Sequence, residues 1–192
     1  MNLIISQKTL VVELLLIFQY FLHYESEWYC SNFRSIKVRA PNIQKNPLDC
    51  CPLPDVFKEE EYKECGLKIK FDDDEKVENG TMEDYCSKLK CLLNKYNLMK
   101  DETNVDKEAV GAFMDKWADT NEEFRGAVEI AKDKCLKEDL SKIFEEGYKL
   151  CQPNIFVYCT SVTVYSNCPI WQDKQICKDV KEYIDECKPF FP

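Results

Sequence analysis

The cysteines of this chain constrain its fold more than any other feature of the sequence. There are twelve among 192 residues, an even number, and all lie after residue 29. In an exported protein such a set predicts six disulfides rather than free thiols. No Cys-x-x-Cys pair is present, so the usual spacing of zinc ligands is missing. We therefore expect disulfides at Cys30, Cys50, Cys51, Cys65, Cys86, Cys91, Cys135, Cys151, Cys159, Cys168, Cys177 and Cys187.

The start of the chain has the features of a secretory signal peptide. A single early base, Lys8, precedes a mostly apolar run at 10–22. This run is short for a membrane span, but it fits the apolar core of a signal peptide that is cleaved near residues 24–27. We expect a signal peptide over residues 1–24 and one secreted, extracellular domain over residues 25–192. No later run approaches spanning length, so membrane insertion is not expected.

Removal of that segment would leave a chain without histidine, because His23 is the only one. The most versatile acid, base and metal ligand would then be absent. The five glycines do not cluster, which argues against phosphate-binding loops. The net charge of −9 and the pI of about 4.8 disfavour nucleic acid and anionic membranes as partners. We expect no enzyme activity, cofactor or metal.

Two short motifs fall in one charged loop, residues 68–80. The acidic run 72–75 lacks the alternating ligands and the turn glycine of an EF-hand, which favours a solvated loop over a calcium site. Asn79 begins the glycosylation sequon Asn-Gly-Thr. The sequence is compatible both with a glycosylated Asn79 and with an unused sequon.

The spacing of apolar residues predicts an all-α protein. Steps of three and four predict helices at 55–65, 81–96, 105–118, 120–135, 140–148 and 176–187. The fourth begins with a capping-box pattern at 120–123. Residues 155–165 are ambiguous, because β-branched side chains favour a strand and the cysteine spacing favours a helix. We expect a compact bundle of about six or seven short helices, cross-linked by six disulfides.

The order of cysteines and prolines resembles that of insect odorant-binding proteins of the Plus-C subgroup, within the pheromone and general odorant-binding protein superfamily. The doubled cysteine in Asp49-Cys50-Cys51-Pro52-Leu53-Pro54 and the step Asn167-Cys168-Pro169-Ile170-Trp171 carry the likeness. Cys91 and Cys135 have 43 residues between them. Two spacings depart from the family pattern. Four residues lie between Cys86 and Cys91, and seven lie between Cys151 and Cys159.

The resemblance implies a disulfide pattern in which the framework cysteines pair first with third, second with fifth and fourth with sixth. Carried over, it suggests the pairs Cys86–Cys159 and Cys135–Cys168. Cys91 would then pair with Cys50, Cys51 or Cys65, and these three alternatives stay open.

The resemblance also implies a function. Such proteins carry small hydrophobic molecules (odorants, pheromones or other apolar semiochemicals) through aqueous lymph in an internal apolar cavity between helices. Small hydrophobic ligands are the expected partners, an olfactory receptor is a further one, and the protein would be a monomer or a homodimer. The alternative is a secreted, disulfide-rich interaction protein, such as an inhibitor or a salivary or venom factor, that uses its surface loops.

The wall of such a cavity should come from apolar residues of the predicted helices. Each of these residues could instead fill the core, because every apolar stripe on a helix is buried against something. The candidates for ligand contact are Leu89, Leu93, Phe113, Met114, Trp117, Phe124, Val128, Phe144 and Tyr148.

The absence of histidine from the expected mature chain generates a first prediction. Any acid-triggered release must use carboxylates, whose reference pKa values lie near 4. We expect the affinity for an apolar fluorescent probe to change little between pH 7 and about pH 5.5. Titration of the probe at a series of pH values measures this, and a steep loss of affinity near pH 6 would instead reveal a buried acid with a raised pKa.

Overall fold

The computed structural model describes residues 47–67, 82–137, 140 and 151–188. Its helices in these ranges are α3 (Glu59–Glu64), α4 (Met82–Lys95), α5 (Lys107–Thr120), α6 (Arg125–Lys137), α7 (Gln152–Ser166) and α8 (Gln175–Cys187). Two short 3-10 turns, η1 (Pro47–Cys50) and η2 (Glu122–Phe124), complete the secondary structure. A lone bridge between Met99 and Val105 is the only strand-like pairing in the described ranges. The predicted helical class is confirmed for this part of the chain.

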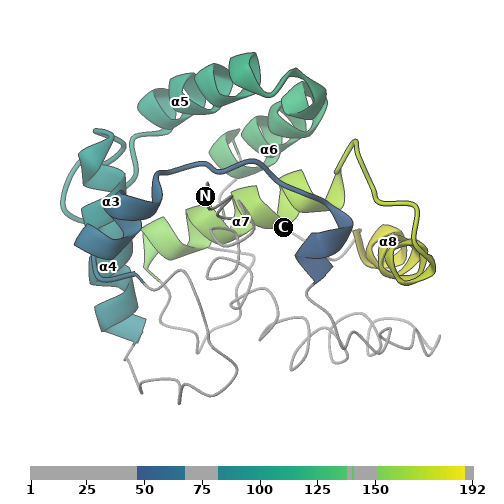
Figure 1. Ribbon diagram of the computed structural model, residues 1–192. Coiled ribbons are helices and arrows are strands. Elements are labelled where there is room, and N and C mark those ends of the chain that lie inside the picture. Colours follow the sequence, from purple (N-terminus) through teal and green to yellow (C-terminus); the bar gives the residue numbers. More distant parts are fainter. Residues whose placement is uncertain (1–46, 68–81, 138–139, 141–150, 189–192) are drawn as a thin grey trace, which may run out of the picture.

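Helix α7 occupies the centre of the arrangement (Figure 1). It packs most extensively against α6 and also contacts α4 and α8. Neighbours on several sides explain its sequence, because a helix that is covered all round carries apolar residues without a clear stripe. The ambiguous segment 155–165 is therefore helical. Burial of its β-branched residues, including Val157, Val162 and Val164, outweighs their local preference for strands.

The helix ends follow local hydrogen bonding. The Asp106 carboxylate caps α5 by accepting from the backbone N–H groups of Glu108 and Ala109, both at 3.0 Å. The capping box predicted at 120–123 does not form. Thr120 remains in α5, where its hydroxyl donates to the carbonyl of Trp117, and η2 intervenes before α6 begins.

The helix predicted to start at Asp55 also begins later, at Glu59, after an N-cap at Lys58. There the backbone N–H of Lys58 donates to the Glu61 carboxylate at 2.9 Å. Residues 52–58 before it form no helix, because the prolines at 52 and 54 disfavour helix for Cys51 and Leu53, which precede them, and the chain bends at residues 56–57.

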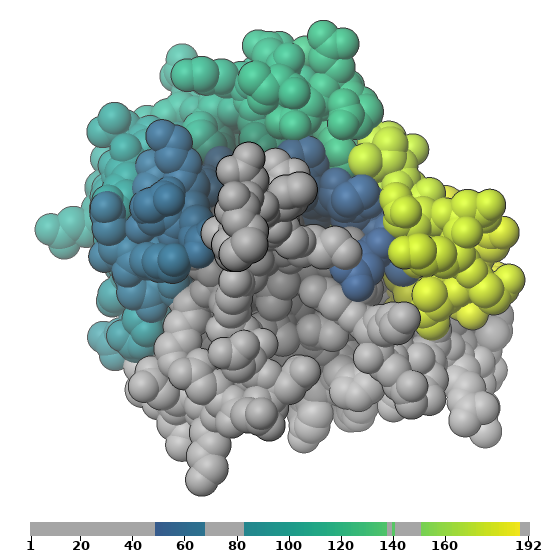
Figure 2. Space-filling view, viewed as in Figure 1, coloured from purple at the N-terminus to yellow at the C-terminus, as the bar shows by residue number. Residues whose placement is uncertain are grey.

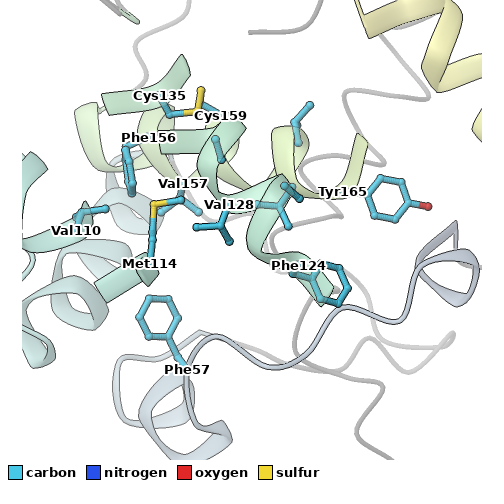
Figure 3. Close-up of a cluster of buried hydrophobic side chains, with 14 of the residues drawn as sticks. Phe57, Val110, Met114, Phe124, Val128, Cys135, Phe156, Val157, Cys159 and Tyr165 are labelled. Carbon is cyan, nitrogen blue, oxygen red and sulfur yellow. A yellow bond between two sulfur atoms is a disulfide. The ribbon is translucent and has the colours of Figure 1, made fainter. Parts of the chain in front are cut away.

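A single apolar core joins the helices. The stripe predicted on α6 is buried as expected, with Val128, Ala131 and Cys135 each exposing 2% or less of their surface. Figure 3 shows Met114 of α5, Val128 of α6 and Val157 of α7 lying together where the three helices meet. The core thus forms along the length of α7.

Five disulfides connect described cysteines, and Cys187 is also disulfide-bonded. Of the three partners left open for Cys91, the structure selects Cys65. Cys30 lies outside the described residues. The five bonds are Cys50–Cys177, Cys51–Cys168, Cys65–Cys91, Cys86–Cys151 and Cys135–Cys159.

Both of the pairs carried over from the family, Cys86–Cys159 and Cys135–Cys168, are wrong. Cys86 bonds to Cys151 at the start of α7, and Cys135 bonds to Cys159 in the middle of that helix. These two positions on α7 are about 12 Å apart along the helix axis. Helices α4 and α6 are therefore fastened to α7 at different levels.

The general order of pairing nevertheless holds. When Cys65 is the first framework cysteine, Cys151 the fifth and Cys159 the sixth, the bonds join first with third, second with fifth and fourth with sixth. The error lay in assigning the fifth and sixth places one cysteine too late. Cys168 is instead an additional cysteine that bonds to Cys51.

Several expectations fall outside the described residues. They are the signal peptide, the acidic run 72–75, the sequon at Asn79 and the helix at 140–148 apart from Leu140, which is buried. No described helix has the length and apolar character that a membrane crossing requires.

The packing of η2 generates a prediction about stability. Phe124 exposes 0% of its surface, so Phe124→Ala should lower the free energy of unfolding by about 3–5 kcal/mol through lost burial and the cavity that remains. Ile130, which is 44% exposed, provides the control, and Ile130→Ala should change stability by less than about 0.5 kcal/mol. Urea unfolding measures both, and equal midpoints for the two variants would contradict this packing.

Candidate ligand pocket

An extended segment, residues 51–58, crosses from η1 to α3, and we call it the strap (Figure 1). Its first residue is bonded to Cys168, just beyond the end of α7. Seven residues after the strap, Cys65 is bonded to Cys91 of α4. The neighbouring Cys50 bonds to Cys177 of α8, so the two adjacent cysteines bring separate segments to one point. The strap is thus held covalently near both ends.

The middle of the strap is attached to α5. The indole N–H of Trp117 donates to the backbone carbonyl of Asp55 at 3.1 Å. Two residues on, the ring of Phe57 stacks on Phe113 with a centroid separation of 5.5 Å. One hydrogen bond and one aromatic stack therefore fix the position of the strap between its covalent ends.

An aromatic cluster secures the end of the strap at α3. Phe57 also contacts Tyr62 and Tyr96, with centroids 5.7 and 5.0 Å away. The Tyr96 hydroxyl donates to the carboxylate of Glu61. Partial burial and this hydrogen bond raise the pKa of Tyr96 to about 12. Partial burial acts to raise the pKa of Glu61, but the hydrogen bonds from Tyr96 and from the backbone of Lys58 outweigh it, and the pKa is lowered.

Beneath the strap lies a partly open apolar pocket of about 90 Å³. One side is the strap itself and the other sides come from four helices. The described lining residues are Leu53, Pro54 and Val56 of the strap, Tyr62 of α3, Phe113, Met114 and Trp117 of α5, Val128 of α6, and Thr160, Ser161 and Val164 of α7. Figure 2, in the same view as Figure 1, shows α3 at one side, α8 at the other and α5–α6 along the top.

Four of the nine residues expected from the sequence line this pocket, namely Phe113, Met114, Trp117 and Val128. Three others, Leu89, Leu93 and Phe124, are buried in the core. Leu89 and Leu93 belong to α4, which contributes no described residue to the pocket. Phe124 packs against the ring of Trp117, with centroids 5.6 Å apart. Phe144 and Tyr148 lie outside the described residues.

Sequence reasoning missed the strap and the polar side of α7. Pro52 and Pro54 between fixed cysteines indicate an extended segment, but nothing in the sequence shows which helices that segment covers. Thr160 and Ser161 are polar, and a search for apolar stripes passes over them.

No described lining residue of the pocket is charged, and its polar side-chain atoms belong to Tyr62, Thr160, Ser161 and the indole N–H of Trp117, which donates to Asp55. Asp55 lies in the strap between two lining residues. Partial burial and the nearby negative charge of Glu59 raise the pKa of its carboxyl. No group of acidic, histidine or cysteine side chains in the described ranges is arranged to hold a metal ion. The arrangement suits the burial of an apolar molecule.

Comparison with known proteins agrees with the cysteine pattern. A protein named General odorant-binding protein 68, from Anopheles gambiae, is 22% identical over 160 residues, which cover 77% of this chain and 73% of the relative. The chain is a distant homologue of this odorant-binding protein. No protein-family model matches the chain.

The attachment of the strap generates a prediction. Trp117→Phe keeps an aromatic ring but removes the N–H that donates to Asp55. We expect stability to fall by about 0.5–1.5 kcal/mol and backbone amides at 53–57 to exchange with solvent several-fold faster. Hydrogen exchange with mass spectrometry measures this.

Trp171→Phe is the matched control, since the Trp171 ring packs on Tyr165 with centroids 5.4 Å apart and its indole N–H makes no hydrogen bond to residues 53–57 in the described part of the chain. Its amide exchange at 53–57 should equal that of the parent protein. Unchanged exchange in Trp117→Phe would show that the strap does not depend on this hydrogen bond.

Proposed function

We propose that this protein is a secreted carrier that holds small hydrophobic ligands in the pocket beneath the strap and transports them through aqueous fluid. The observation that carries the proposal is an apolar pocket between helices, closed on one side by a disulfide-fixed segment. The distant odorant-binding relative points the same way. Odorants, pheromones and other apolar semiochemicals form the ligand class, and a role in olfaction follows from that class.

The free energy of burying an apolar ligand favours the use of this pocket by a carrier. Each Å² of apolar surface that a ligand buries contributes about 25 cal/mol before the costs of ordering. These costs are smaller when the site is already formed. Disulfides at Cys51 and Cys65 hold the strap in place without a ligand, so the pocket need not be assembled at the moment of binding.

The covalent chemistry supports secretion. Five disulfides among the described residues are typical of an oxidising compartment. The expected signal peptide over residues 1–24 would direct the chain into the secretory pathway. Assignment to the Plus-C subgroup rests on the cysteine–proline steps at Cys51-Pro52 and Cys168-Pro169 and on their mutual bond.

The proposal is tested by binding of an uncharged anilinonaphthalene fluorophore. Phe113 forms part of the pocket wall and also supports Phe57 of the strap. We expect Phe113→Ala to weaken binding about 5- to 30-fold, because apolar contact with the probe is lost. Ile130→Ala, on the exposed side of α6, should bind as the parent protein does.

Circular dichroism confirms that both variants are folded before affinities are compared. Unchanged affinity in a folded Phe113→Ala protein would place the probe elsewhere. Native mass spectrometry adds a second measurement, since a carrier should retain small molecules that the probe displaces. A protein that binds neither the probe nor any co-purified small molecule would contradict the carrier function and favour a secreted interaction protein.

A further inference from the structure

The wall of the pocket that α7 provides differs from the others. Thr160, Ser161 and Val164 lie on the side of α7 that faces the pocket, at steps of one and three residues. Thr160 and Ser161 are both partly buried. The described residues of the strap, α5 and α6 that line the pocket are apolar apart from the indole N–H of Trp117, which is engaged with Asp55. Polar contacts to a ligand are therefore concentrated on α7 and on Tyr62.

The two hydroxyls of α7 are not equivalent. Thr160 donates its proton to the carbonyl of Phe156 at 2.9 Å, and so it can only accept a further hydrogen bond. Within the described part of the chain, no hydrogen bond engages the hydroxyl of Ser161. Ser161 can therefore both donate to and accept from a ligand.

The surroundings disfavour an ionic ligand. A charged group that leaves water without a partner loses its hydration, and this loss is much larger than that of a neutral polar group. No described lining residue carries a charge to compensate. At the strap, partial burial and the negative charge of Glu59 raise the pKa of the Asp55 carboxyl, so the surroundings of Asp55 disfavour a further anion. The neighbouring Lys58 interacts with Glu61.

We infer that the pocket selects uncharged ligands that combine a compact hydrocarbon body with one hydroxyl or carbonyl oxygen, and that Ser161 hydrogen-bonds to this oxygen. Alcohols, aldehydes, ketones and esters meet this description, whereas carboxylates do not. The inference rests on the proposed carrier function and adds the chemical selectivity of the same site. Ser161 is the residue that determines the selectivity, and the apolar walls supply most of the affinity.

The experiment compares octane, octanol and octanoate as competitors of the uncharged fluorophore at pH 7, with the full secreted protein. Their chains are equal in length, so they differ in the terminal group. Octanol should displace the probe at a concentration at least about 10-fold lower than octanoate. Ser161→Ala should weaken octanol about 3- to 10-fold, the range expected for one hydrogen bond, and leave octane unchanged.

Ser166→Ala is the matched control, because Ser166 is a buried serine of the same helix that is not among the described lining residues. It should leave the order and affinity of all three competitors as in the parent protein. Equal loss for octane and octanol in Ser161→Ala, or no loss for either, would overturn the role of Ser161. Displacement by octanoate as readily as by octanol would overturn the selectivity for neutral ligands.

These outcomes are distinct from failure of the carrier function itself. A protein that does not bind the fluorophore at all contradicts the proposed function. A protein that binds the fluorophore but does not distinguish the competitors contradicts only this inference.

Discussion

The bond between Cys51 and Cys168 is the constraint on which the pocket depends. It joins an extended segment near the start of the described chain to the residue just past the end of α7, 117 positions later. The strap has no helix or strand of its own to fix its path, because the ladder hydrogen bonds of regular structure are absent from it. The covalent anchor fixes one end of the segment that covers the apolar side chains of α5, α6 and α7 in the pocket.

The second requirement is a central helix that other elements can be fastened to. Cys86–Cys151 fixes α4 at the start of α7, and Cys135–Cys159 fixes α6 halfway along it. Disulfides act largely by restricting the unfolded chain, and here they also set the level at which each helix meets α7. The surface ion pairs add little by comparison, since exposed pairs such as Lys63–Glu59 and Lys137–Asp133 contribute at most modestly to stability.

These two features together explain how the described helices can keep an apolar pocket between them. Protein cores normally close to high density, and apolar walls without fixed positions would collapse onto one another. The strap is held at Cys51, attached to Trp117 in its middle and packed through Phe57 at its end. Each attachment lies beside the pocket, so the wall keeps its shape while its interior remains available to a small molecule.

The sequence alone determined the helical class, the extents of α4, α5 and α8 to within two residues, and the buried stripe of α6, because these follow from local spacing. The apolar stripes also supplied four residues of the pocket, Phe113, Met114, Trp117 and Val128, and the resemblance to odorant-binding proteins supplied the general order of cysteine pairing. Only the tertiary structure decided which cysteines occupy the fifth and sixth places. Cys151, Cys159 and Cys168 follow one another at steps of eight and nine residues, and the choice among them depends on the level at which α4 and α6 dock. The covering of the pocket by the strap was likewise decided in three dimensions, since a segment without periodicity carries no information about the surface on which it lies.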